Sequence, residues 1–235
     1  WSDSVRDYRL LIFDWDGTLV DSIGRIVASL RYAAGMCDLP QLGDEQLKGI
    51  IGLGMLEAID CLYPGLRATP KVDCFRRAYG EHYLQLEQEP SALFPGVLEA
   101  LDAFRADGYQ LAVATGKSRR GLNAVLTGRD WLDYFDVTRC ADETASKPDP
   151  LMLREILAHC RVNSEQALMV GDSVFDLQMA RHAAVHSVAV GYGAQSLATL
   201  KAESPTLSIE HFDELRAWMG TRAGKQKKER SDNVR

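Results

Sequence analysis

Two aspartates one residue apart follow an apolar run near the start of the chain. Leu10–Phe13 is apolar, and Asp14 and Asp16 come directly after it, just before Gly17. Residues i and i+2 of a strand lie on the same face, so these two carboxylates would repel each other. A bound cation or a catalytic acid and base pair would account for them. A surface turn is the alternative, since Asp-Gly is a common turn pair.

Three segments further along the chain carry polar residues at the ends of apolar runs or at a helix start. They are Thr115 and Gly116 after the run 111–114, Lys147 before Pro148, and Asp172 and Asp176 after the run 167–170. In open parallel sheets, functional groups gather in the crevice at the carboxyl ends of the strands. Carboxylates, a hydroxyl and a lysine brought together there would suit a divalent cation and a phosphate group.

This ordered set of motifs resembles that of the haloacid dehalogenase-like hydrolase superfamily, in its phosphoglycolate-phosphatase-like group. The four motifs are Asp14-Trp15-Asp16-Gly17-Thr18, the strand-end Thr115, Lys147 in a Lys-Pro-Asp-Pro setting, and Gly171-Asp172-Ser173-Val174-Phe175-Asp176. The resemblance covers about residue 8 to about residue 218. Each motif alone is common, whereas all four in this order are highly specific.

The resemblance implies a phosphatase that forms an aspartyl-phosphate intermediate. Asp14 would be the nucleophile, and Asp16 would act as general acid on the leaving oxygen and later as base on water. Mg²⁺ would be held by the carboxylates of Asp14 and Asp172 and by the backbone carbonyl of Asp16. The implied substrate is a small phosphate monoester such as phosphoglycolate, a sugar phosphate or a nucleotide.

The remaining motif residues would bind the phosphate or support its binding. Thr115 through its hydroxyl and Gly116 through its N–H would hold phosphate oxygens, and Lys147 would add positive charge beside Asp14. Asp176 would orient the metal's waters or Lys147.

Three alternatives to a phosphatase stay open. A phosphomutase of the same superfamily commonly carries a His twelve residues after the nucleophile, where this chain has Ile26. Family dehalogenases lack the second aspartate, so Asp16 favours a phosphatase or a mutase. A phospho-aspartate receiver uses similar residues, but it has no helical insert. A catalytically idle binding protein would not need the intact motif set.

An α/β core is expected to position these motifs. From residue 93 onward, apolar strands alternate with helices, which is typical of a doubly wound, Rossmann-like parallel sheet. The expected strands are 110–115, 136–140, 167–170, 186–190 and one near 207, and the expected helices are 97–107, 118–126, 150–160, 174–183, 195–201 and one ending near 218. Residues 8–20 and 93–218 would form this core.

Residues 21–92 show helical periodicity instead, and we expect them to form an inserted helical cap domain. The expected helices are 23–36, 44–50, 55–62 and 72–88. The two chain crossings, 19–22 and 91–95, would act as hinges. The loop 52–54 would reach the site or be a simple turn, Arg25 and Lys48 are candidate anion partners, and Lys117 is expected at the surface or the mouth of the site.

Composition limits the function classes further. The 235 residues carry a net charge of −6 with no basic stripe, which argues against nucleic acid as a partner. No apolar stretch approaches a membrane span and no signal-peptide pattern opens the chain, so we expect a cytoplasmic protein. The five cysteines show no paired spacing and are expected to be reduced and mostly buried. Residues 219–235 are expected to form a disordered basic tail.

Overall fold

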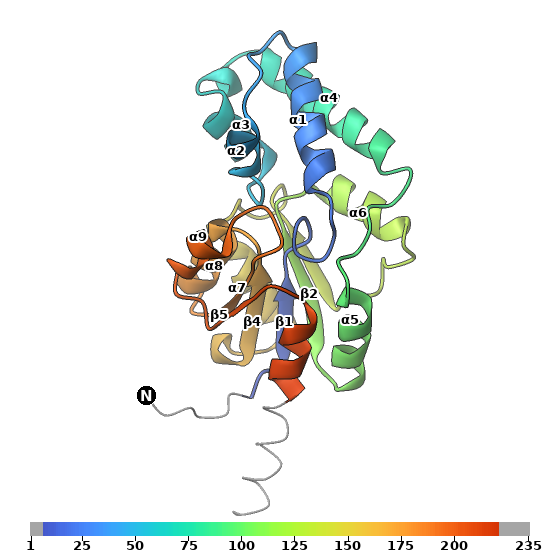
Figure 1. Cartoon of the computed structure of the whole chain (residues 1–235), viewed down its shortest axis with the longest axis vertical. Coiled ribbons are helices and arrows are strands. Elements are labelled where there is room, and N and C mark those ends of the chain that lie inside the picture. The colour runs from blue at the N-terminus through green and yellow to red at the C-terminus, as the bar shows by residue number, and fades with distance from the viewer. Residues whose placement is uncertain (1–6, 221–235) are drawn as a thin grey trace, which may run out of the picture.

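A parallel β-sheet organises residues 7–220, the part of the chain described by the computed structural model (Figure 1). Its strands are β1 (Leu10–Phe13), β2 (Gln110–Thr115), β3 (Val137–Cys140), β4 (Ala167–Gly171), β5 (His186–Val190) and β6 (Leu207–Ile209). They lie in the order β3-β2-β1-β4-β5-β6, and every pair is parallel. The chain winds outward in both directions from β1, so a crevice forms at its carboxyl end. The predicted fold class is confirmed.

Alternate strand residues supply two apolar layers, one on each face of the sheet. Leu11 and Phe13 of β1 pack on the side of α5 (Val97–Ala106), α6 (Arg119–Thr127) and a terminal helix over 213–220. Leu10 and Ile12 pack on the side of α7 (Leu151–Cys160) and α8 (Val174–His182). The short α9 (Leu197–Lys201) covers part of β5. Because helices cover both faces, the central strands β1 and β4 carry no polar side chain.

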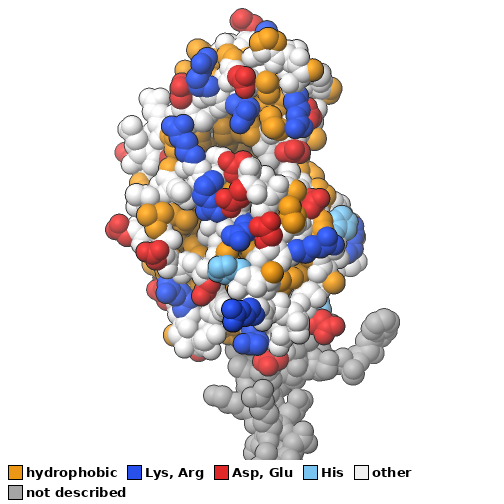
Figure 2. Space-filling view, turned by 180° about the vertical axis from the view of Figure 1, so that it is seen from behind, with side chains coloured by type: hydrophobic (Ala, Val, Ile, Leu, Met, Phe, Trp, Pro, Cys, Tyr) orange, Lys and Arg blue, Asp and Glu red, His pale blue; other side chains and the backbone are white. Residues whose placement is uncertain are grey.

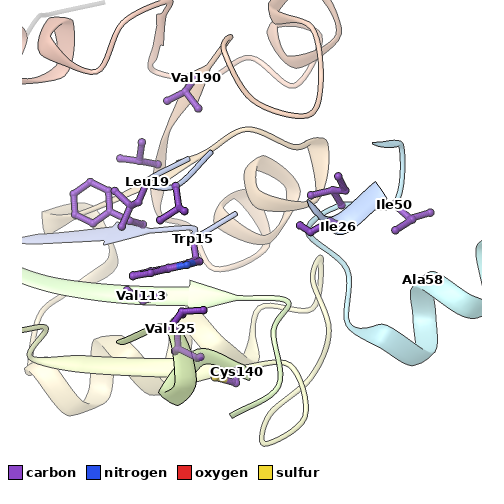
Figure 3. Packing of buried hydrophobic residues seen from close by; sticks show 14 of the residues in the cluster. Trp15, Leu19, Ile26, Ile50, Ala58, Val113, Val125, Cys140 and Val190 are labelled. Carbon is purple, nitrogen blue, oxygen red and sulfur yellow. The ribbon is translucent and has the colours of Figure 1, made fainter. Parts of the chain in front are cut away.

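The segment between β1 and α5 is helical. It contains α1 (Ile23–Met36), α2 (Asp44–Lys48), α3 (Met55–Leu62), a 3₁₀ helix (Leu66–Ala68) and α4 (Lys71–Leu86). Figure 1 shows these helices, here called the helical insert, above the carboxyl ends of the strands. Figure 3 shows Ile26, Ile50 and Ala58 of the insert together, away from Trp15 and Val113 beside the strands.

Most helix and strand positions match the sequence expectations to within a few residues. The 3₁₀ helices Leu66–Ala68 and Ser164–Gln166 were not expected. Three residues are too few to show a periodic pattern, so such turns leave no signal in the sequence.

The two chain crossings between the core and the helical insert lie side by side. Val20 forms an antiparallel bridge with Leu93, and the Asp21 N–H donates to the Ala92 carbonyl at 2.9 Å. Arg25 lies at this junction, where its Nη1 is 3.0 Å from Glu87 Oε1 and donates to the Leu86 carbonyl. The guanidinium is therefore occupied by α4 and its C-terminal end, not by an anion in the site.

The C-terminal boundary of the core differs from the expectation. Met219 was expected to be the first residue of the tail. It is 3% exposed and packs in the main apolar core, so it belongs to the core and not to the tail. The apolar residues of the last helix continue to Met219, whereas the core predicted from the sequence ended one residue earlier. The rest of the expected tail, 221–235, lies outside the described residues.

All five cysteines are free thiols, and Cys37, Cys140 and Cys160 are buried, as expected. Within residues 7–220, no helix combines the length and the apolar character that crossing a membrane requires.

Candidate active site

Three buried carboxylates meet at the carboxyl ends of β1 and β4. Asp14 follows β1 and its N–H donates to the Val170 carbonyl of β4 at 2.9 Å. Asp172 follows β4, and Asp176 is in the first turn of α8. One oxygen from each of the three lies within 4.8 Å of the others. Strand pairing and a helix start thus concentrate negative charge in one place.

Lys147 supplies positive charge to this carboxylate cluster. Its Nζ is 2.6 Å from Asp14 Oδ1 and 2.7 Å from Asp176 Oδ1, and its side chain is fully buried. Burial works against the charged ammonium, yet the carboxylates of Asp14 and Asp176 raise its pKa above the ordinary lysine value. Lys147 is therefore a permanent cation that ties two of the three carboxylates together.

One lysine does not neutralise three carboxylates. Burial, assisted by the charge of Asp176 and opposed by Lys147, raises the pKa of Asp14 to about 7. Burial and the charges of Asp14 and Asp176 also raise the pKa of Asp172 well above its ordinary value. The cluster therefore favours a proton or a further cation.

The donor set fits Mg²⁺. All three side chains offer oxygen, which hard divalent cations prefer. Asp14 Oδ2 is buried and has no hydrogen-bond partner among the described residues, although its sister oxygen is held by Lys147. A buried carboxylate oxygen without a donor is costly unless a cation or a ligand satisfies it.

Asp172 is fixed by backbone and hydroxyl donors. Its Oδ2 accepts from the Ala194 N–H at 2.6 Å, and its Oδ1 accepts from the Thr18 hydroxyl at 3.2 Å. Gly17 has a φ of +79°, and a Cβ there would overlap the Asp172 carboxylate. The glycine of the first motif is therefore required both for its backbone conformation and for space.

The Asp16 side chain lies apart from the carboxylate cluster. Its Oδ1 accepts from the Ser22 hydroxyl at 2.6 Å and is 3.0 Å from Lys117 Nζ. The metal ligands expected from the sequence were Asp14, Asp172 and the backbone carbonyl of Asp16. The third carboxylate found beside Asp14 and Asp172 is that of Asp176.

Lys117 corrects an expectation from the sequence. We expected it at the surface or at the mouth of the site. The surface is wrong, because the side chain is only 8% exposed, pairs with Asp16 and lines the cavity beside it. Its Nζ also donates to the Tyr83 hydroxyl of α4 at 2.9 Å and lies over the Tyr83 ring. Burial disfavours its charge, but Asp16 and the nearby tyrosines raise its pKa above the ordinary value. The sequence held one indication of this position, because Lys117 comes directly after the motif residues Thr115 and Gly116.

Thr115 and Gly116 mark the end of β2, next to Asp14. Thr115 is fully buried, and its Oγ1 accepts from the Lys117 N–H at 3.2 Å. A Cβ on Gly116 would collide with the carbonyl oxygens of Gly52 and Leu53. The loop 52–54 of the helical insert therefore descends onto the end of β2.

A second contact fixes the same loop. The Gly54 N–H donates to the Ser146 hydroxyl at 2.8 Å, beside Lys147 in sequence. The loop 52–54 was expected either to reach the site or to be a simple turn, and its contacts with Gly116 and Ser146 place it at the site.

A cavity of about 500 Å³ lies between the helical insert and the strand ends. Asp14, Asp16, Gly116 and Lys117 line its lower side, and α1, α3 and α4 contribute most of its upper side. Lys48 is not among the lining residues. Figure 2 shows a hollow in the upper half of the molecule, with hydrophobic side chains inside it and charged ones around it. The buried carboxylate of Asp14 thus opens onto a space large enough for a metabolite.

The chain belongs to the haloacid dehalogenase-like hydrolase family, whose model matches residues 11–190. It is 34% identical over 213 residues to a probable phosphatase, IndB, of Dickeya dadantii, covering 88% of this chain and 91% of that protein. It is 30% identical over 241 residues to a phosphoglycolate phosphatase of Salmonella typhimurium, covering 93% and 95% of the two chains.

Solved structures agree with the family assignment. A predicted phosphoglycolate phosphatase from Haemophilus somnus superposes with a TM-score of 0.79 at 27% identity, covering 91% of this chain and 98% of that one. The resemblance expected from the four motifs is therefore confirmed.

Proposed function

We propose that this protein is a Mg²⁺-dependent phosphatase that hydrolyses a phosphate monoester of a small molecule through an aspartyl-phosphate. The observation that carries the proposal is the environment of Asp14. Lys147 holds its Oδ1, while Oδ2 has no partner among the described residues, and the side chain lines the cavity. The names of the relatives, a probable phosphatase and a phosphoglycolate phosphatase, support the same reaction class.

In the first step, a carboxylate oxygen of Asp14 attacks phosphorus. The new bond joins Asp14 to phosphorus, and the bond between phosphorus and the leaving oxygen breaks. Protonated Asp16 gives its proton to the leaving oxygen, so the product leaves as an alcohol. Thr115, Gly116 and Lys147 bind the phosphate oxygens and reduce their repulsion of Asp14.

In the second step, water attacks phosphorus of the aspartyl-phosphate. Asp16, now ionised, accepts the proton of that water, and the bond between Asp14 and phosphorus breaks. Lys117 Nζ, at 3.0 Å, and the Ser22 hydroxyl, at 2.6 Å, both contact Asp16 Oδ1 and hold this carboxylate apart from the carboxylate cluster.

Asp14 and Asp172, with the carbonyl of Asp16, are proposed to hold Mg²⁺, and Asp176 to orient Lys147 and the metal's waters. When bound, the ion would neutralise charge on the phosphate and on the carboxylates. The partly unneutralised cluster and the oxygen donors support this assignment.

The helical insert, residues 21–92, is proposed to act as a cap over a core of residues 8–20 and 93–219. The adjacent crossings at Val20 and Leu93 would let it open and close as one unit. Ile26, where sugar phosphomutases of this group carry a histidine, is an apolar lining residue of the cavity. This position favours hydrolysis over phosphoryl return to a bound intermediate.

Phosphate release from a panel of metabolite phosphates tests the proposal. Wild-type protein is expected to release phosphate with Mg²⁺ and to stop when EDTA removes the ion. A folded protein that releases no phosphate from any ester with Mg²⁺ present would contradict the proposal. An isomerised product without free phosphate would identify a mutase instead.

A further inference from the structure

The two sides of the cavity differ in chemistry. Its floor carries the charged groups Asp14, Asp16 and Lys117, all from the core. Its upper side, from the helical insert, is mixed: α4 contributes Asp73, Arg76, Arg77, Tyr79, Glu81 and Tyr83, and the rest is a group of aliphatic and thioether side chains, here called the apolar wall. They are Ile26, Leu30, Ile50, Met55, Ala58 and Leu84.

The apolar wall is part of the folded core of the insert and is not a chance exposure. Leu30 and Ala58 are 1% and 3% exposed and pack in the main apolar cluster. Met55 and Leu84, which also line the cavity, are only partly buried and present apolar surface to it. Apolar surface facing a water-filled cavity costs free energy that a matching ligand surface recovers. The wall therefore favours a substrate with apolar surface at the end away from the phosphate.

A small, highly charged anion such as phosphoglycolate matches this cavity poorly. Its carboxylate would lie close to the phosphate and near Asp14 and Asp16, which repel it. Lys117, the cation beside Asp16, is already paired with Asp16 and bonded to Tyr83. Two carbons would also leave the apolar wall in contact with water.

Cations also line the cavity, and all three arginines among them are exposed. Arg76 pairs with Asp73, whereas Arg77 of α4 and Arg120 of α6 have no ion-pair partner among residues 7–220. Their exposure suits the attraction of anionic substrates from solution.

We propose that the substrate is a phosphate monoester whose alcohol part is larger than glycolate and carries an apolar or aromatic body that packs on the apolar wall. This inference rests on the proposed phosphatase function and refines it to a class of substrate. The phosphate lies on the floor beside Asp14, and the body of the alcohol fills the space below α1, α3 and α4.

A series of alkyl phosphates tests the apolar wall without changing intrinsic reactivity. Ethyl, butyl and hexyl phosphate have nearly equal leaving groups, so differences in kcat/KM report binding of the chain. We expect kcat/KM to rise about tenfold or more from ethyl to hexyl phosphate, and hexyl phosphate to exceed phosphoglycolate. An aryl phosphate and a nucleoside monophosphate extend the series to aromatic bodies.

The outcomes separate this inference from the proposed function. A flat or falling alkyl series, with phosphoglycolate as the best substrate, would overturn the inference and leave the phosphatase intact. No phosphate release from any ester in the series or from phosphoglycolate would overturn the phosphatase itself.

A pair of methionines gives a matched test by substitution. Met55 lines the cavity, whereas Met36, at the end of α1, is 58% exposed and is not a lining residue. Met55→Gln is expected to lower the ratio of hexyl to ethyl kcat/KM at least about fivefold. Met36→Gln is expected to leave that ratio unchanged. A ratio that stays unchanged in Met55→Gln, whether or not both esters react more slowly, would contradict a role for the apolar wall. Met55→Leu keeps an apolar side chain and should retain the ratio.

Discussion

The floor and the apolar wall of the cavity are built in different ways. On the floor, the charged side chains are paired at short distances, with Lys147 at 2.6 Å from Asp14 and Lys117 at 3.0 Å from Asp16. Strand ends and one helix start place these groups, so a few local motifs define the arrangement. On the wall, the side chains come from α1, α3 and α4 and, for Ile50, from the loop between α2 and α3, and they are held by packing. The chemistry of the reaction is thus fixed locally, whereas the choice of substrate depends on how distant helices assemble.

Asp14→Asn should have the largest effect on activity, because it removes the proposed nucleophile from the floor of the cavity. We expect kcat to fall by at least about 1000-fold while the helical insert keeps its structure. Phosphate release under single-turnover conditions measures the loss, and circular dichroism checks the fold. Asp21→Asn, a change of the same type at an exposed residue, is the control and should keep full activity. Comparable loss in both variants would contradict the assignment.

Lys117→Met tests the residue that joins the floor to the helical insert. Removing the ammonium leaves Asp16 without its cation and Tyr83 without its hydrogen-bond donor. We expect kcat to fall by about 10- to 100-fold, because Asp16 is no longer held in place.

Tyr83→Phe is the matched variant for Lys117→Met, since it removes only the hydroxyl contact. It should lower kcat by less, and the pH profile of kcat should move more in Lys117→Met than in Tyr83→Phe. Equal effects in both variants would mean that Lys117 acts on the helical insert and not on Asp16.

Mg²⁺ should raise the free energy of unfolding by binding to the carboxylates of the floor, without a contact to the apolar wall. At 100 times its Kd, the ion is expected to add about 2.7 kcal/mol to the free energy of unfolding, measured as a higher Tm. Burial raises the pKa of Asp14 to about 7, so at lower pH the ion must displace a proton. The Tm gain should therefore be larger at pH about 8 than at pH about 6. Asp172→Asn should reduce the gain, and a gain that is independent of pH and of Asp172 would argue against this site.

Gly116→Ala should have the smallest of these effects and tests the contact between floor and insert. The added methyl collides with the carbonyls of Gly52 and Leu53, so the loop must move. Overpacking of this kind is expected to cost about 1–3 kcal/mol of unfolding free energy. Gly24→Ala in α1, where nothing lies within 4 Å of the new methyl, should instead be neutral or stabilising by up to about 1 kcal/mol. Equal Tm changes in the two variants would contradict the contact.

The sequence predicted the floor better than the wall for a physical reason. Asp14, Thr115 and Asp172 each end an apolar strand run, and parallel strands bring their carboxyl ends to one edge. The pattern and the order of motifs were therefore enough to predict the fold class and to gather these residues.

The wall and the junction left weaker signals. Met55 and Leu84 are ordinary helix residues in the sequence, and only the packing of α3 and α4 brings them to the cavity. Lys117 was misjudged because most lysines are exposed, and its burial depends on Asp16 and on Tyr83 from a different segment. Arg25 looked like an anion partner, but Glu87, 62 residues away in sequence, pairs with it.

The most direct test of the account is to identify the residue that carries the phosphoryl group during turnover. Wild-type protein would be mixed with a rapidly hydrolysed ester and Mg²⁺, quenched in acid within the first turnover, and mapped by peptide mass spectrometry. We predict an acid-stable, hydroxylamine-sensitive phosphoryl group on Asp14 whose formation and decay match the rate of phosphate release. Steady turnover without any phosphoryl group on Asp14, or with one on another residue, would contradict the account.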